Sequence, residues 1–233
     1  MRMRTKKWAK PELAVCPFYI PDPSPRRGRW AEEFAVPQPL WLELGCGKGG
    51  FLAQAALAHP DRNFLGVDLS TDVLGVGRRK IQSAYFEAGR EIGNLRMTIF
   101  DITRIDLFLS PEDQAERIFI NFCNPWPKPK QYKKRLTHSR QLAKYRAFLP
   151  NGGEIWFKTD DDELFTHSVR YFEESGFRIR YRTEDLHKSG FEPNFRTEHE
   201  EMYSAEGIKI KFLIAEKLPD GEKESPSFLT PVS

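Results

Sequence analysis

The feature that most limits the fold of this sequence is an alternation of short apolar runs with stretches of helical periodicity. Five runs of this kind are typical of buried parallel strands: LWLEL (40–44), NFLGVDL (63–69), LRMTIF (95–100), RIFINF (117–122) and EIWFKT (154–159). Between them, apolar residues recur at helical spacing near 50–58, 71–89, 139–149 and 161–175. This order predicts right-handed βαβ units and a doubly wound, mostly parallel α/β sheet of the Rossmann type.

The two ends of the chain differ from this central pattern. FRIRYR (177–182) and IKIKFLIAE (208–216) alternate apolar with basic residues, which predicts an antiparallel pair at the sheet edge. Residues 1–39 are rich in proline and arginine and are predicted to form an extended basic arm. Residues 218–233 are polar, carry three prolines and are predicted to be disordered. We therefore expect one folded domain over 40–217, a size that suits a chain of 233 residues.

Composition excludes several classes of protein. Lys and Arg total 36 against 33 Asp and Glu, so a net charge of +3 does not by itself indicate a polyanionic partner. Cys16, Cys46 and Cys123 lack the spacing of a disulfide framework or a zinc site, so we expect reduced thiols and no metal. No run approaches the roughly 18 apolar residues of a membrane span. No apolar run follows the basic N-terminal residues either, so they do not resemble a secretory signal. We expect a cytoplasmic protein, with no obligate protein partner evident and its oligomeric state open.

The first predicted strand ends in a glycine-rich turn, ELGCGKGG (43–50). Glycines there let the backbone approach a ligand, but their spacing fits both dinucleotide and other nucleoside ligands. Glu43 separates these readings, because a carboxylate repels a pyrophosphate and attracts the ammonium and sulfonium of S-adenosylmethionine. An ordinary strand-end acid is the alternative interpretation.

Two more acids follow the next predicted strands. Asp68 lies about 20 residues beyond the glycines, where it can accept from ribose hydroxyls. Asp101 ends the third strand, where it can accept from the adenine amine. Either could instead be a helix cap. Three acids at successive strand ends of one sheet edge nevertheless predict an S-adenosylmethionine site, with Gly45 and Gly47 in its turn.

The fourth predicted strand leads into NFCNPWPKPK (121–130), a loop that two prolines around Trp126 should stiffen. Basic residues then crowd together, with Trp126 and Tyr132 among them: Lys128, Lys130, Lys133, Lys134, Arg135 and Arg140. This mixture predicts a surface that contacts RNA phosphates and stacks on bases. A solvated basic loop is the alternative.

These motifs resemble the bacterial tRNA (guanine-N7-)-methyltransferases, from the MRMRTKKWA start to about residue 217. The most specific stretches are ELGCGKG, NFCNPWPKPKQYKKRLTHS, EIWFKTD and RTEHEEMYSAEG. The resemblance implies a Rossmann-like methyltransferase sheet with an antiparallel edge strand and S-adenosylmethionine as methyl donor. It also implies tRNA as partner, with N7 of a variable-loop guanine as acceptor.

The resemblance also implies roles for particular residues. Cofactor contacts fall on Glu43, Asp68, Asp101 and the position of Asn124. Contacts with the guanine fall on Lys128, Asp160 and the segment from Thr197 to Glu200, principally those two residues. The family loop usually reads S-D-P-W-P-K, and here Asn124 stands in place of the aspartate. Compared with an aspartate, it keeps an acceptor oxygen but lacks the negative charge. From the residues alone, Asp160 ends the fifth strand on the same edge, and T-x-x-E could equally be a capping box.

Guanine N7 carries a lone pair and no proton, so its methylation requires no general base. Catalysis should then consist of positioning and electrostatics, with Asn124 at the methyl group and Asp160 and Glu200 stabilising the purine cation. Two other interpretations remain open. Asn124-Pro125-Trp126 is similar to the N-P-P-aromatic loop of N6-adenine and glutamine methyltransferases. The loss of the aspartate would also suit a non-catalytic or weakly active RNA-binding protein that keeps the fold.

Overall fold

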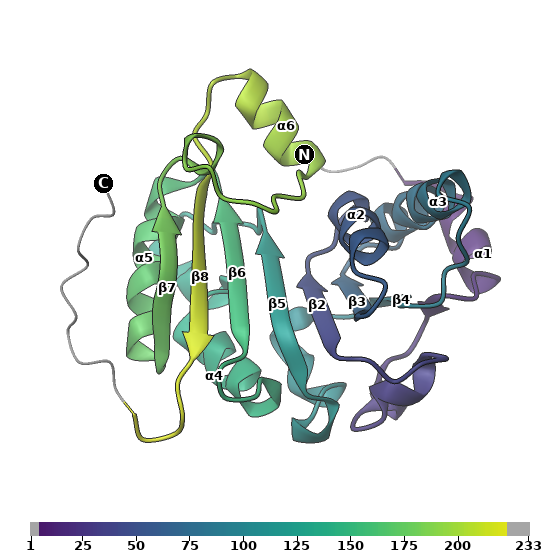
Figure 1. Ribbon diagram of the computed structural model, residues 1–233, viewed down its shortest axis with the longest axis horizontal. Coiled ribbons are helices and arrows are strands. Elements are labelled where there is room, and N and C mark those ends of the chain that lie inside the picture. The colour runs from purple at the N-terminus through teal and green to yellow at the C-terminus, as the bar shows by residue number, and fades with distance from the viewer. Residues whose placement is uncertain (1–4, 223–233) are drawn as a thin grey trace.

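A computed structural model describes residues 5–222 as one eight-stranded sheet with helices on both faces (Figure 1). The strands are β1 (Tyr19–Ile20), β2 (Leu40–Leu44), β3 (Asn63–Asp68), β4 (Leu95–Ile99), β5 (Ala115–Asn121), β6 (Glu154–Thr159), β7 (Phe177–Thr183) and β8 (Lys211–Lys217). Their order is β1-β4-β3-β2-β5-β6-β8-β7, and β8 runs antiparallel to both of its neighbours. The doubly wound, mostly parallel sheet is confirmed, as is the antiparallel pairing of the last two strands.

Helices are present in the four stretches predicted near 50–58, 71–89, 139–149 and 161–175, and two short helices, Ala9–Ala14 and Glu198–Ala205, fall outside those stretches. The α-helices are α1 (Ala9–Ala14), α2 (Gly50–Ala58), α3 (Thr71–Glu87), α4 (Ser139–Phe148), α5 (Asp162–Glu174) and α6 (Glu198–Ala205). Short 3-10 turns are η1 (Ser24–Arg26), η2 (Trp30–Glu33), η3 (Ile102–Leu107), η4 (Pro111–Asp113), η5 (Pro129–Lys134) and η6 (Leu186–Lys188). Side-chain caps help to set the helix starts; at α3, for example, Ser70 accepts from the Val73 amide, and at α5 Asp161 accepts from the Leu164 amide.

Side chains alternate between two cores on opposite faces of the sheet. On β2, Leu42 packs into the core that α4 and α5 close, whereas its neighbour Trp41 packs into the core beneath α2 and α3. A third, smaller cluster lies over β6 and β8 and includes Phe212, with Phe191 packed against it. This cluster is covered by the chain between β7 and β8, which carries α6 (Figure 1).

The N-terminal segment predicted as an extended arm packs against the body of the protein. Ala9 of α1 is buried against α3, where a Cβ on Gly75 would lie 2.5 Å from the Ala9 Cβ. β1 adds a parallel strand beside β4, and the buried Trp30 donates from its indole nitrogen to the Phe108 carbonyl at 2.8 Å. The apolar residues of this segment have no period, but most of them, such as Leu13, Phe18 and Trp30, are buried in the two cores.

The predicted disordered tail lies mostly outside the described residues, which end at residue 222. The first tail residue, Leu218, is buried, and its amide donates to the Gly176 carbonyl. Within residues 5–222, no helix has the length and apolar character required to cross a membrane.

The topology places the site. Strands β2 to β6 are parallel, so their carboxyl ends share one edge of the sheet. The chain winds outward from β2 in one direction through β3 and β4, and in the other through β5 and β6. Open α/β sheets bind ligands at such a reversal, outside the carboxyl ends of the strands.

Candidate functional site

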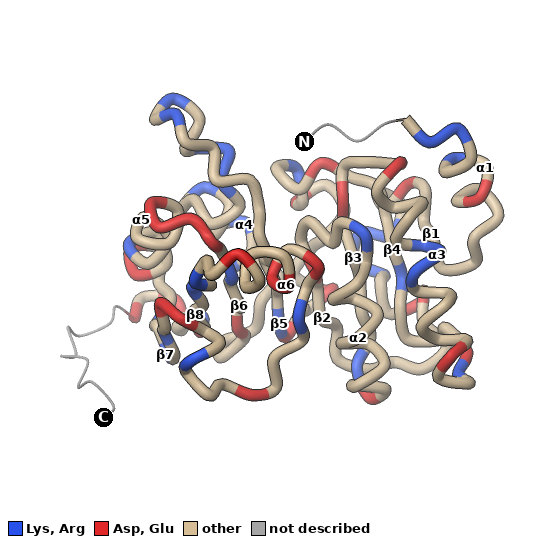
Figure 2. Tube along the Cα trace, turned by 90° about the horizontal axis from the view of Figure 1, so that it is seen from above, with Lys and Arg blue, Asp and Glu red and all other residues tan. Residues whose placement is uncertain are grey.

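The predicted site residues follow the strand order along this edge. Asp101, Asp68 and Glu43 belong to the ends of β4, β3 and β2, and Asn124 and Asp160 follow β5 and β6. Figure 2 looks onto this edge. The three acids therefore lie on one side of the reversal, and the residues expected to meet the guanine lie on the other.

The glycine-rich turn has a backbone that glycine alone adopts readily. Gly45 and Gly47 have φ of +83° and +53°, and Gly45 donates to the Val67 carbonyl on β3. Gly66 lets the turn lie close to β3, because a Cβ there would meet Leu52 Cδ2 at 2.5 Å and Cys46 Sγ at 3.0 Å. The turn is thus packed closely against β3, at the carboxyl edge of the sheet.

Glu43 is a buried carboxyl group with an unpaired oxygen. Its side chain is 2% exposed, and Oε1 accepts from Asn121 Nδ2 at 3.1 Å. Oε2 is also buried and finds no donor among the residues that the structure describes. Burial raises the pKa of Glu43 to about 8, Asp68 adds to this rise, and Asn121 and Lys158 oppose it. A buried acceptor left unpaired is costly, so Oε2 of Glu43 is open to a hydrogen-bond donor from a ligand.

Asp68 connects the second strand to the glycine turn. Its Oδ2 accepts from the Gly47 amide and its Oδ1 from the Ser70 amide, both at 3.0 Å. Burial raises the pKa of Asp68, and the hydrogen bonds from backbone amides oppose this rise. These bonds fix the carboxylate at the edge, while each oxygen keeps a lone pair for a ligand.

Asp101 serves as a helix cap. Its Oδ1 accepts from the Thr103 amide at 2.9 Å and from the Thr103 hydroxyl at 2.7 Å, at the start of η3. The cap interpretation therefore holds for this residue. A contact with an adenine amine stays a prediction, and Oδ2 is the oxygen that would accept this hydrogen bond.

The loop after β5 has two non-glycine residues in the left-handed region. Phe122 has φ of +52° and Trp126 has φ of +44°, conformations that cost energy and cluster at functional sites. Asn124 between them is exposed, and its Oδ1 accepts from the Trp126 amide at 3.0 Å. This turn is closed by the side-chain oxygen of Asn124, an acceptor that an aspartate at this position would also provide.

The basic residues beyond this loop form a projecting surface. Lys128, Lys130, Lys133 and Lys134 are exposed, and Lys134 Nζ lies 4.8 Å from the Trp126 ring. In Figure 2 this segment extends from the body with Lys and Arg coloured blue. Arg135 is an exception to the expected patch: its side chain is fully buried.

Asp160 lies at the end of β6 with its carboxylate partly accessible. Its backbone carbonyl accepts from Lys211 Nζ at 2.8 Å. Between residues 5 and 222, its carboxylate oxygens have no hydrogen-bond partner. They are therefore open to donors from a substrate.

Glu200 has a different environment from the one expected. Thr197 caps α6 by accepting from the Glu200 amide at 3.0 Å, but the Glu200 side chain does not return this bond. It is fully buried, with Oε2 accepting from Lys158 at 3.0 Å and Oε1 from Asn194 and His187 at 2.8 and 2.9 Å. Burial alone would raise the pKa of Glu200, but these donors hold it below its usual range. This geometry favours an anchoring role, and direct contact of Glu200 with a base stays a prediction.

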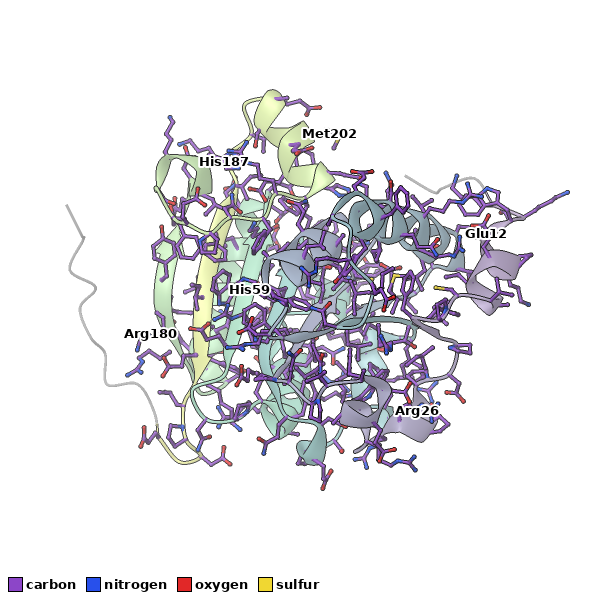
Figure 3. All side chains as sticks on the ribbon, turned by 45° about the vertical axis from the view of Figure 1, so that its right-hand side comes forward. Glu12, Arg26, His59, Arg180, His187 and Met202 are labelled. Carbon is purple, nitrogen blue, oxygen red and sulfur yellow. The ribbon has the colours of Figure 1, made fainter. Side chains whose placement is uncertain are left out.

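We call residues 189–205 the strap, because they cross the carboxyl edge above β5 and β6 (Figure 1). Glu198 pairs with Lys48 of the glycine turn at 3.1 Å and also with Lys80 of α3. The Gln54 side chain of α2 donates to the Arg196 carbonyl at 3.0 Å. His187, just before the strap, lies at the same end of the molecule as Met202 of α6 (Figure 3). The strap therefore connects the cofactor side of the edge with the substrate side.

Sequence reasoning missed Asn121 and Lys158 as candidates in this region, and it placed the buried Arg135 in the RNA-contacting patch. Asn121 and Lys158 lie in strands whose other residues are apolar, and polar residues inside such runs are a usable signal. Nothing in the sequence separates Arg135 from the exposed lysines beside it.

Comparison with known proteins gives consistent matches. Residues 37–213 match the family model described as "Putative methyltransferase". The tRNA (guanine-N(7)-)-methyltransferase of Ruminiclostridium cellulolyticum is 55% identical over 217 residues, which cover 93% of this chain and 92% of that protein. The protein of the same name from Clostridium beijerinckii is 54% identical over 217 residues, covering 93% and 99%. A solved structure titled "Structure of an Antibiotic Related Methyltransferase" shares the fold, with a TM-score of 0.55, 14% identity and 94% and 97% coverage.

Proposed function

The chain belongs to the tRNA (guanine-N(7)-)-methyltransferase family, and on that premise we propose that it methylates N7 of a guanine in the variable loop of tRNA. The observation that carries the proposal is the buried, unpaired Oε2 of Glu43 beside a glycine turn at the sheet reversal. A carboxyl group in that place suits the ammonium of S-adenosylmethionine and would repel the pyrophosphate of a dinucleotide. The cytoplasm, where tRNA is found, is the compartment we propose.

The cofactor residues divide by the part of the donor that each would hold. Glu43 would receive the ammonium, Asp68 the ribose hydroxyls and Asp101 the adenine amine, with Gly45 and Gly47 letting the backbone approach. Asn124 would lie beside the methyl group. Bound S-adenosylmethionine supplies a methyl group activated by its sulfonium.

The substrate residues lie on the other side of the reversal. Lys128 would contact the guanine or its phosphate, and Asp160 offers accessible carboxylate oxygens to guanine N1–H and the exocyclic amine. A carboxylate near the ring also stabilises the positive charge that the purine gains when N7 is alkylated. Thr197 and Glu200 would shape the wall of the site through the strap. No residue has to remove a proton before N7 reacts, so orientation is the main task of the protein.

Family membership and the site disfavour the two alternatives. A protein that had lost catalysis would gain nothing from a buried unpaired carboxyl at Glu43. The N-P-P-aromatic loop of an N6-adenine or glutamine methyltransferase has two successive prolines, whereas here Trp126 follows Pro125 and exposed lysines follow the loop.

The test is transfer of radiolabelled methyl from S-adenosylmethionine to tRNA that lacks the modification, followed by borohydride and aniline cleavage. We expect one strong cleavage in the variable loop. Label at an adenine or in protein would overturn the proposal, as would cofactor binding without transfer to any tRNA.

A further inference from the structure

We propose that Arg135 is a positioning residue that holds the Phe122–Lys128 loop in its reactive shape. The proposal rests on the function proposed above, because that function gives Asn124 and Lys128 of this loop their roles. Arg135 lies among five exposed basic residues, yet its own side chain is fully buried.

The guanidinium of Arg135 binds the loop through its backbone. Nε donates to the Pro125 carbonyl at 2.6 Å, and Nη2 lies 3.4 Å from the Trp126 carbonyl. These carbonyls belong to the two residues directly after Asn124. Trp126 needs support, because its φ of +44° is unfavourable for a residue with a bulky side chain.

The other side of the guanidinium is fixed to α5. Nη2 donates to Glu163 Oε1 at 3.0 Å, and Nη1 lies 2.8 Å from His167 Nδ1. The Tyr132 ring covers its face, 3.8 Å from Cζ. The loop is therefore connected through Arg135 to a helix of the rigid domain, in the manner of a support behind a functional site.

Because its side chain is fully buried, Arg135 is not placed to contact RNA directly, unlike the lysines around it. A fully buried arginine is stable only when its donors are paired, and here they are paired by the loop, Glu163 and His167. Lysine could not substitute, because its single ammonium cannot reach two carbonyls and a carboxylate in a planar fork.

A matched control is available in Arg146 of α4. Its guanidinium also donates to two backbone carbonyls, those of Gly176 and Leu218, but at the opposite edge of the sheet. Arg135→Ala and Arg146→Ala should therefore both lower stability, whereas only the first should alter the reaction.

The experiment measures kcat and KM for tRNA and S-adenosylmethionine, together with hydrogen exchange over residues 122–130. For Arg135→Ala we expect kcat to fall about 100-fold, the loss typical of misplaced reacting groups, with KM for S-adenosylmethionine unchanged and faster exchange in the loop. Arg135→Lys should recover little of kcat, and Arg146→Ala should keep both kcat and loop exchange.

Three results would overturn the proposal: unaltered exchange in the loop of Arg135→Ala, full recovery by Arg135→Lys, or an equal loss of kcat in Arg146→Ala. If Arg135→Ala does not fold, Glu163→Ala is the substitute, because Glu163 is half-exposed and anchors one side of the guanidinium. This variant should show a smaller fall in kcat, again with faster hydrogen exchange in the loop. Loop exchange reports on the anchoring even if the wild-type protein methylates no tRNA, so failure of the proposed function is recognised separately.

Discussion

Individual carboxyl groups in this site differ mainly in how many donors already reach them. Glu200 is saturated by Lys158, Asn194 and His187, whereas the Oε2 atom of Glu43 has no partner among the described residues. The same residue type is thus an internal anchor in one place and an open acceptor in the other. A ligand gains free energy only from the second kind.

The raised pKa of Glu43 makes both stability and cofactor binding depend on pH. Its pKa rises from 4.5 to about 8 on folding, so the folded protein holds a proton that the unfolded chain releases in this window. The stability contribution is therefore fully present below pH 4.5 and is lost as the pH rises toward 8. Without cofactor, we expect the Tm to fall across this range in the wild type and to fall less in Glu43→Gln.

Cofactor binding should change in the opposite direction. Because the ammonium pairs with ionised Glu43, affinity should rise with pH up to about 8, by at most about tenfold per pH unit. Calorimetric titrations from pH 6 to 8 measure this, and Asp101→Asn should bind more weakly with the same pH slope. For the stability prediction, a Tm that falls with pH as steeply in Glu43→Gln as in the wild type would show that another group titrates.

A second residue-scale prediction concerns Asn124→Asp. The substituted carboxylate can still accept from the Trp126 amide, so the turn should keep its shape. It also adds a negative charge beside the site where positive charge moves to the purine, so kcat should rise several-fold with cofactor affinity unchanged. Single-turnover rates of methyl transfer measure this. An unchanged rate with intact binding would show that the charge at this position is not used.

At the scale of elements, the strap is attached to the sheet by one buried ion pair. Lys158 Nζ on β6 donates to Glu200 on α6 and also contacts the Asn194 side chain and the Phe195 carbonyl. The ion pair of Glu198 with Lys48 is partly exposed and therefore weak. Apolar packing adds to the attachment, because Phe191 contacts Phe212 and Phe195 contacts Phe51. The position of α6 above the site thus depends on the buried Lys158–Glu200 pair together with this packing.

Removing both members of this pair should cost less free energy of unfolding than the sum of the two single removals. Lys158→Met leaves the Glu200 charge buried without its cation, and should lower the free energy of unfolding by about 3–5 kcal/mol. Lys158→Met combined with Glu200→Gln should lose less than the sum of the single changes. Urea unfolding measures the cycle, with the exposed Arg29–Glu32 pair as a control expected to contribute at most about 1 kcal/mol. Strict additivity would show that the pair does not hold the strap.

At the scale of the whole molecule, charge is distributed unevenly although the total is small. A net charge of +3 hides a projecting segment that carries four exposed lysines within seven residues, 128–134. Neutralising phosphates releases counterions, so such a segment makes RNA binding dependent on salt. The arginines of β7 are different, because Arg178 and Arg180 both pair with Glu216.

We therefore expect Lys130→Ala and Lys133→Ala each to weaken tRNA binding and to lower the slope of log K against log salt by about one. Arg180→Ala, at the outer edge of the sheet, should change neither quantity (Figure 3). Filter binding at several salt concentrations measures both. A slope unchanged in both lysine variants would exclude this segment from the tRNA contact.

The sequence by itself determined the central strands and helices and the edge where the candidate site lies. Their positions between residues 40 and 175 follow from local periodicity, and parallel topology brings together the strand ends that carry Glu43, Asp68, Asp101 and Asp160. Only the tertiary structure decided which polar groups are free. Glu43 meets Asn121 across 78 residues, and Lys158 meets Glu200 across 42. Burial of Arg135 and packing of the N-terminal segment depend likewise on distant partners, and local patterns do not encode such contacts.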